Sequence, residues 1–157
     1  MSEQPLVETL VKTVLDPRAA TAPASEAAPS FRERFCEALV LCLGNLYGRM
    51  PMSGTLFDRA MLRTVTMGLD DTDAGKFATR TEDWIRLEGI VRAVEGQKSY
   101  VINRPSMAVL CTVTSRGMLG EAMESALARY LDKTPTEALR KSTRQMGAYF
   151  LTRIARS

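Results

Sequence analysis

The sequence contains no histidine. Histidine is the most common general base at neutral pH and the most common metal ligand, so its absence removes Ser-His, Cys-His and most zinc chemistries. The three cysteines, Cys36, Cys42 and Cys111, are an odd number without paired spacing, which does not indicate a disulfide framework. We expect Cys36 and Cys42 to be small core residues, and we expect no metal site.

Long apolar runs are also missing. No stretch approaches the roughly 20 residues that a membrane-spanning helix needs. The first residues, Met1 to Pro5, are acidic and lack the basic segment that opens a secretory signal peptide. These absences predict a cytoplasmic protein without a membrane partner.

Catalytic motifs are absent as well. The sequence has no nucleophile motif, no glycine loop that would cradle phosphate and no cluster of metal ligands. The acidic run from Asp70 to Asp73 lacks the ladder of oxygen ligands and the closing Glu of a calcium loop, so we interpret it as a helix-capping turn. We therefore expect neither an enzyme nor a bound cofactor.

The chain has enough residues, 157, for one domain with a real core, and 45% of them are hydrophobic. Its net charge of +3 is uneven. Residues 1–30 hold two basic and four acidic side chains, whereas residues 133–157 hold six basic and one acidic. The basic C-terminal end is suited to phosphate or to an acidic partner surface, and the alternative is an ordinary solvated helix face.

Two segments precede the main domain. Residues 1–15 are predicted to form an amphipathic helix, because aliphatic side chains recur at helical spacing at Leu6, Val7, Leu10, Val11, Val14 and Leu15. Residues 16–30, with three prolines among many Ala, Thr and Ser, are predicted to be a flexible linker. A helix of about three turns is unstable alone, so residues 6–15 must pack on their own domain, on a second copy or on a protein partner.

Residues 31–89 show the pattern of three helices. The first covers about 31–47, with Ser30 as N-cap and Glu33 closing a capping box. The second covers about 55–67. The third ends at Gly89 and begins either at Asp73 or at Thr79.

A β-hairpin is predicted directly after the third helix. Residues 90–103 show strand alternation on both sides of a turn at 95–98. Trp84, Leu87 and Ile90 are expected to bury one side of the helix and its exit. Further helices are predicted from about 104, over 119–131, and from Thr134, with Thr134 as N-cap.

This order of elements, over about residues 31–112, resembles a bacterial winged helix-turn-helix domain. The most specific part is Trp84-Ile85-Arg86-Leu87-Glu88-Gly89-Ile90-Val91-Arg92, which is similar to the end of the third helix in many such domains. The segment 100–105 stands where those families have the second wing strand and the next helix start, although Asn103 replaces their usual Thr. The fold expected is mainly α with a small hairpin, carrying N- and C-terminal helical extensions.

The resemblance implies a role in binding double-stranded DNA, as a small regulator or an architectural factor. The third helix would enter the major groove and the hairpin would touch phosphate or the minor groove. The residues implied are Lys76, Arg80, Thr81, Asp83 and Arg86 on the helix and Gln97, Lys98 and Ser99 at the wing. The alternative is a protein-interaction module without DNA binding, since Glu82 and Asp83 would repel phosphate.

Residues 113–157 are expected to form C-terminal helices that serve for dimerisation. Four apolar residues on the last helix are predicted to make the interface of a homodimer: Leu139, Met146, Tyr149 and Phe150. The basic residues Arg140, Lys141 and Arg144 are expected on its outer face. Such pairing would place two recognition helices against two half-sites.

Overall fold

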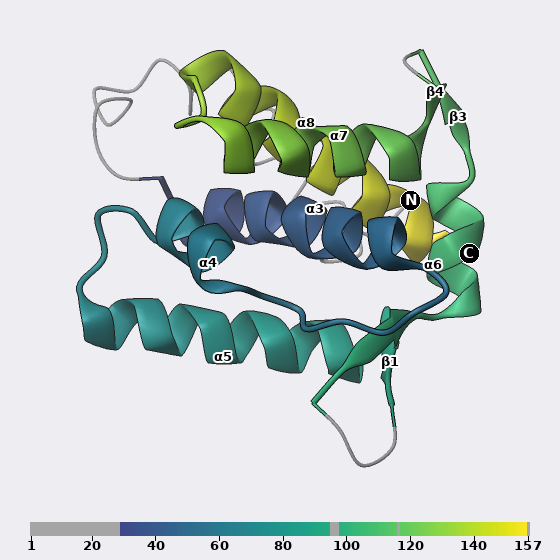
Figure 1. Ribbon diagram of the computed structural model, residues 1–157, viewed down its shortest axis with the longest axis horizontal. Helices are drawn as coiled ribbons and strands as arrows, with labels where there is room; N and C mark the ends of the chain where they lie inside the picture. Colours follow the sequence, from purple (N-terminus) through teal and green to yellow (C-terminus); the bar gives the residue numbers. More distant parts are fainter. Residues whose placement is uncertain (1–28, 95–97, 116, 157) are drawn as a thin grey trace, which may run out of the picture.

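The computed structural model describes residues 29–94, 98–115 and 117–156. In these ranges the fold is mainly α, as expected, with six helices and two small antiparallel hairpins (Figure 1). The predicted helix over 1–15 and all but the end of the predicted linker lie outside the described residues. Among the helices of the described ranges, none has the length and apolar character required to cross a membrane.

The elements follow one another closely along the chain. The helices are α3 (Phe31–Arg49), α4 (Arg59–Val65), α5 (Asp71–Leu87), α6 (Arg104–Leu110), α7 (Leu119–Asp132) and α8 (Glu137–Ala155). The strands are β1 (Val91–Ala93), β2 (Tyr100–Ile102), β3 (Val113–Thr114) and β4 (Gly117–Met118). Strand β1 pairs with β2, and β3 with β4.

Helix α3 is the centre of the molecule. In Figure 1, α7 and α8 lie on one side of it, and α4, α5 and the β1–β2 hairpin lie on the other. It begins with the predicted capping box, because Ser30 Oγ accepts from the backbone of Glu33 and Glu33 Oε1 accepts from the backbone of Ser30. Every residue from Arg34 to Gly44 is buried. Neighbours on both sides therefore cover the middle of the helix all round, while its two ends reach solvent.

Two glycines let the helices approach α3 closely. A Cβ on Gly44 of α3 would lie 2.5 Å from the backbone oxygen of Met123 in α7. A Cβ on Gly147 of α8 would collide with the backbone of Cys36 in α3. At these two points the backbones themselves are in contact, so any side chain there would force the helices apart.

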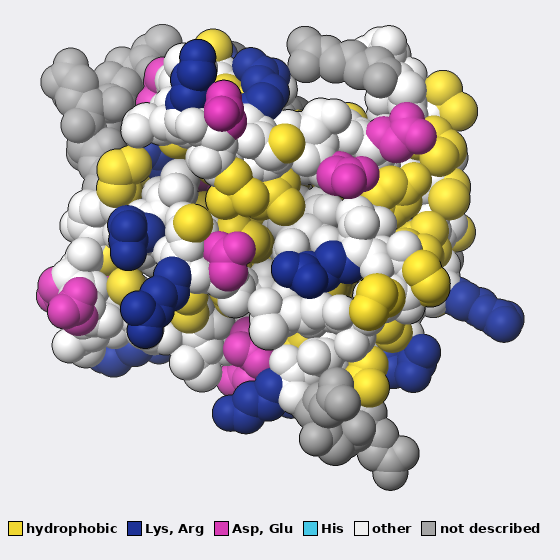
Figure 2. Space-filling model, in the orientation of Figure 1, with side chains coloured by type: hydrophobic (Ala, Val, Ile, Leu, Met, Phe, Trp, Pro, Cys, Tyr) yellow, Lys and Arg dark blue, Asp and Glu magenta, His cyan; other side chains and the backbone are white. Residues whose placement is uncertain are grey.

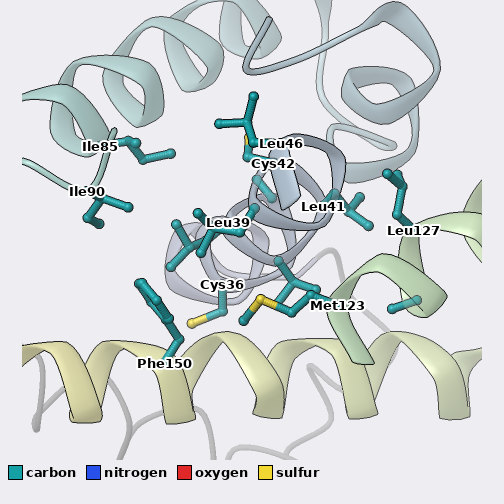
Figure 3. Close-up of a cluster of buried hydrophobic side chains, with 14 of the residues drawn as sticks. Cys36, Leu39, Leu41, Cys42, Leu46, Ile85, Ile90, Met123, Leu127 and Phe150 are labelled. Carbon is teal, nitrogen blue, oxygen red and sulfur yellow. The ribbon is translucent and has the colours of Figure 1, made fainter. Parts of the chain in front are cut away.

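The apolar core fills the space on both sides of α3. Figure 3 shows Leu39 and Cys42 of α3 among side chains from α5, α7 and α8, with Phe150 of α8 pointing towards α3. Trp84 packs at the edge of this core, where its ring meets that of Phe35 edge-on at a centroid distance of 4.9 Å. Burying such a continuous set of apolar side chains is the main force that stabilises the fold.

An ion cluster is buried among these apolar groups. The fully buried carboxylate of Glu37 on α3 accepts from Nε and Nη2 of Arg140 at 2.9 and 3.2 Å, and from Nε of Arg144 at 3.4 Å. The hydroxyl of Tyr130 on α7 donates to the same carboxylate. The prediction that Arg140 and Arg144 lie on the outer face of the last helix is therefore wrong, because Glu37 draws both of them inward.

Several other local predictions need correction. Leu87 is 83% exposed instead of buried, because helix α5 ends there and the chain turns at Gly89, whose φ is +75°. The two cysteines expected in the core are buried, and Cys111 is exposed. The last helix is capped by Thr136 instead of Thr134. Helix α4 is shorter than predicted and is capped by Asp58.

Candidate nucleic-acid interface

Helix α5 begins earlier than either start considered from the sequence. Asp70 is its N-cap, and the Asp70 carboxylate accepts from the backbone of Asp73 at 2.7 Å. The acidic run is thus a capping turn, and its acids lie where the partial positive charge of the helix terminus favours them. The helix is therefore three residues longer than a cap at Asp73 would give and nine longer than a cap at Thr79 would give, and it lies below α3 and α4 in Figure 1.

One face of α5 packs against the core, and the opposite face is open to solvent. Phe77, Thr81 and Ile85, four residues apart, are buried. Among the residues implied by the resemblance, Lys76, Arg80 and Arg86 are exposed, and Asp83 is half-exposed. Thr81 is fully buried instead, so it cannot contact DNA. Two other residues of α5, Thr79 and Leu87, are exposed, and neither was expected at the interface.

The β1–β2 hairpin is held beside the C-terminal end of α5. The hydroxyl of Tyr100 on β2 donates to Glu82 Oε2 on α5 at 2.8 Å. Gly54 exchanges two backbone hydrogen bonds with Tyr100, at 3.0 and 2.7 Å. The chain before α4 is thus a second neighbour of β2, in addition to β1. The amide of Asn103 also donates to the backbone oxygen of Gly89, at 2.7 Å. These contacts fix the hairpin relative to the helix.

Burial and hydrogen bonding shape the chemistry of Tyr100. Burial, followed by the hydrogen bond to Glu82, raises the pKa of the phenol above its usual value near 10. The phenol therefore keeps its proton through the physiological range and remains a donor. This contact ties one carboxylate of α5, that of Glu82, to the hairpin.

Asp83 is also engaged. Its carboxylate accepts from Arg86 Nη2 at 2.7 Å, in a pair one helical turn apart. Both side chains are about half exposed, and such pairs contribute little to stability. Arg86 can therefore exchange this partner for a phosphate or a base edge at small cost. Both acids that argued against DNA contact thus have a local partner.

The β1–β2 hairpin adds further basic groups. Lys98 is exposed and Ser99 is half-buried, while Gln97 lies outside the described residues. Arg92 on β1 is exposed as well, and it was not among the residues expected at the interface, although strand alternation with the buried Val91 would have identified it. Five basic side chains are thus exposed on α5 and the hairpin: Lys76, Arg80, Arg86, Arg92 and Lys98.

Figure 2 shows how this charge is distributed. Along the lower part of the molecule, where α5 and the hairpin lie, dark-blue basic groups alternate with magenta acidic groups. At the N-terminal end of α5, Asp70, Asp71 and Asp73 are all exposed and make that end of the helix acidic. From Lys76 to Lys98 the five exposed basic side chains outnumber the described acidic ones, Glu82, Asp83 and Glu88, so the positive excess is small and confined to the middle and C-terminal part of α5 and to the hairpin.

The four residues expected to form a dimer interface differ in how exposed they are. Phe150 is fully buried and Leu139 is 7% exposed, so both are occupied by the core of their own chain. Met146 is half-buried and Tyr149 is 39% exposed, with Arg153 above its ring. Of the four, only these two remain accessible to another molecule.

Comparison with the profiles of known protein families, with curated proteins and with solved structures gives no match.

Proposed function

We propose that this chain is a winged helix-turn-helix protein that binds double-stranded DNA through α5 and the β1–β2 hairpin. The observation that carries the proposal is that these two elements are in contact and that both expose basic side chains. Three basic residues of α5 and two of the hairpin are exposed, and the Tyr100–Glu82 hydrogen bond holds the hairpin against the helix.

The topology supports this proposal. In the described residues the elements follow the order α3, α4, α5, β1, β2, and Gly54, between α3 and α4, pairs with β2. In a winged helix the helix before the wing inserts into the major groove. Helix α5 is long enough for this role, since 17 residues extend about 26 Å, and within the described residues the side chains on its open side are exposed.

Each exposed group has a definite task in this proposal. Arg80 and Arg86 lie six residues apart on α5, which is less than two turns, and each side chain suits bidentate contact with guanine. Leu87 offers an apolar contact of the kind that a thymine methyl accepts. Lys98 and Arg92 on the hairpin suit phosphate, where contact positions the protein without selecting a sequence.

A second candidate function rests on Leu87. A leucine that is 83% exposed beside basic residues is also what a protein-interaction surface for an acidic partner would present. The two functions differ in their dependence on salt. Binding to DNA releases counterions and weakens steeply as salt rises, whereas contact centred on an apolar side chain does not.

A titration with duplex DNA at several salt concentrations tests the proposal. We expect the double substitution Arg92→Ala with Lys98→Ala to lower the slope of log affinity against log salt by about two, because each phosphate contact contributes about 0.9. The substitution Arg80→Ala should weaken binding mainly to preferred sequences, as a base contact does.

The matched control removes the same charge from the opposite side of the molecule. Lys133, which follows α7, and Lys141 on α8 are exposed, and α7 and α8 lie across α3 from α5 in Figure 1. Replacing both with Ala should leave the slope unchanged. If this control weakens binding as much as the Arg92 and Lys98 variant, the affinity follows net charge and the proposed face is wrong. An absence of binding to any duplex at low salt would favour the protein-interaction function.

A further inference from the structure

A groove of about 700 Å³ runs between α7 and α8, on the side of the molecule opposite to α5. Its apolar lining includes Ala122 and Ala126 of α7 and Leu139, Met146 and Tyr149 of α8. We propose that residues 6–15 of the same chain form a helix that docks in this groove. The groove would then be filled by the chain's own amphipathic segment, at a site separate from the proposed DNA-binding face.

The dimensions of the groove fit this occupant. Its α7 wall extends from Leu119 to Arg129, eleven residues that span about 16 Å. The segment 6–15 as a helix is about 15 Å long. Small side chains, Ala122 and Ser125 on one wall and Ser142 on the other, leave room for the aliphatic stripe of a third helix.

The chemistry of the two surfaces is complementary. The segment carries six aliphatic side chains on one face and needs an apolar surface to be stable as a helix. The segment 6–15 holds one acidic side chain, Glu8, and one basic, Lys12. The groove lining likewise holds one acid, Glu121, and one base, Arg129, so the complementarity of the two surfaces is apolar and no net charge opposes the docking.

The linker places the segment within reach. Helix α3 starts at Phe31, and Glu37, less than two turns further on, binds Tyr130 and Arg140 beside the end of the groove formed by Arg129 and Leu139. Fifteen residues, 16–30, have a root-mean-square span of roughly 20 Å and a limit of about 50 Å. A linker of this length holds the segment at an effective concentration on the order of millimolar. A second copy at micromolar concentration competes poorly against that.

Disulfide formation in the full-length chain tests the docking. Cys111→Ser removes the exposed native thiol, and the buried Cys36 and Cys42 stay in place. In that background Leu10→Cys is combined with Ser125→Cys, since Ser125 is exposed in the groove and Leu10 lies on the aliphatic face. The control pair is Thr9→Cys with Ser125→Cys, because Thr9 lies on the opposite side of the predicted helix.

We expect mild oxidation to join Leu10→Cys to Ser125→Cys within one chain at least tenfold faster than the Thr9→Cys control. A disulfide that links two chains would show that the groove takes the segment of a second copy, and would overturn the proposal. Equal rates for both pairs would show that the segment does not dock, and would overturn it as well.

A second measurement keeps the segment free of cysteines. In the Cys111→Ser, Ser125→Cys chain, Leu10→Asp should speed the reaction of the Ser125→Cys thiol with a maleimide by about tenfold, because it releases the segment that covers the thiol. Thr9→Asp adds the same charge on the other side of the segment and should leave the rate unchanged. If Leu10→Asp also leaves the rate unchanged, the groove is already open and the proposal is wrong.

Discussion

The buried carboxylate of Glu37 offers the sharpest test of how the core is held together. Replacing Glu37 with Ala removes the acceptor of two hydrogen bonds from Arg140, one from Arg144 and one from Tyr130. The side chains of Arg140 and Arg144 are only 11% and 9% exposed, so neither guanidinium can be fully hydrated where it stands. Arg140 would lose its carboxylate partner within the packed interface of α3 and α8, and Arg144 would keep only the longer contact of its Nη1 with Glu137 Oε2, at 3.7 Å.

The expected cost follows from that geometry. Removing one partner of a buried ion pair costs about 3–5 kcal/mol, because the charge left behind loses its compensation. This is a large part of the roughly 5–15 kcal/mol that stabilises a typical domain. The exposed pair Asp83–Arg86 is the matched comparison, and Asp83→Ala should cost less than about 1 kcal/mol.

Urea denaturation measures both variants. With a slope on the order of 2 kcal/mol per molar urea, Glu37→Ala should lower the midpoint by about 2 M, and Asp83→Ala by less than about 0.5 M. The slope should stay the same, because the folded state keeps its compactness.

An apolar replacement of the whole cluster separates the charge effect from packing. The triple substitution Glu37→Met, Arg140→Met and Arg144→Leu leaves no unpaired charge, so it should be more stable than Glu37→Ala. A Glu37→Ala variant that loses less than about 1 kcal/mol would refute the reasoning, since it would mean that the two arginines find water or another acceptor without cost.

Three further predictions concern the backbone contacts, the hairpin and the thiols. Gly147→Ala should destabilise the fold by about 1–3 kcal/mol because its Cβ meets the backbone of α3, whereas Gly75→Ala, on the open face of α5, should stabilise it by about 0.5–1 kcal/mol; thermal unfolding compares the two. In the folded state the pKa of Tyr100 lies above the unfolded value near 10, so the unfolded state loses this proton first. The free energy of unfolding should therefore decrease as the pH rises beyond 10. In alkaline denaturation, the free energy of unfolding of the Tyr100→Phe variant should decrease less steeply with pH. Cys36 and Cys42 are buried, and burial raises the pKa of Cys36 to about 12, whereas Cys111 is exposed. A thiol reagent should therefore react quickly with Cys111 alone in the native chain and with all three cysteines after unfolding. Two fast-reacting thiols in the native chain would contradict this prediction.

Local signals predicted those parts of the fold whose cause is local. The capping box at Ser30 and Glu33, the glycine that ends α5 and the alternation on both sides of the hairpin turn each involve residues within a few positions of one another. The same kind of signal placed three basic residues correctly on the open face of α5. The same signal placed Thr81 wrongly on the exposed face. Two starting residues for the helix were possible, so the sequence did not settle which residues form its buried face.

Features that depend on distant partners were not predictable in this way. Glu37 looks like one polar residue on an apolar helix, and its partners Tyr130 and Arg144 lie 93 and 107 residues further along the chain. The basic residues near the C-terminus were therefore assigned to solvent, where an amphipathic pattern would place them. The β3–β4 hairpin was missed because its strands contain only two residues each, too few for any alternation to be visible.

The central position of α3 has a consequence for the order in which the protein is made. This helix is the first described element to leave the ribosome, and its apolar surface is covered largely by α7 and α8, the last two. At about 5–20 residues per second, the hundred or so residues between Glu37 and its arginine partners take roughly 5–20 s to synthesise. During that interval the Glu37 carboxylate and the leucines around it face solvent or transient partners. The core can close only when α8 has emerged, so native folding of this chain is completed after nearly all of it has been synthesised.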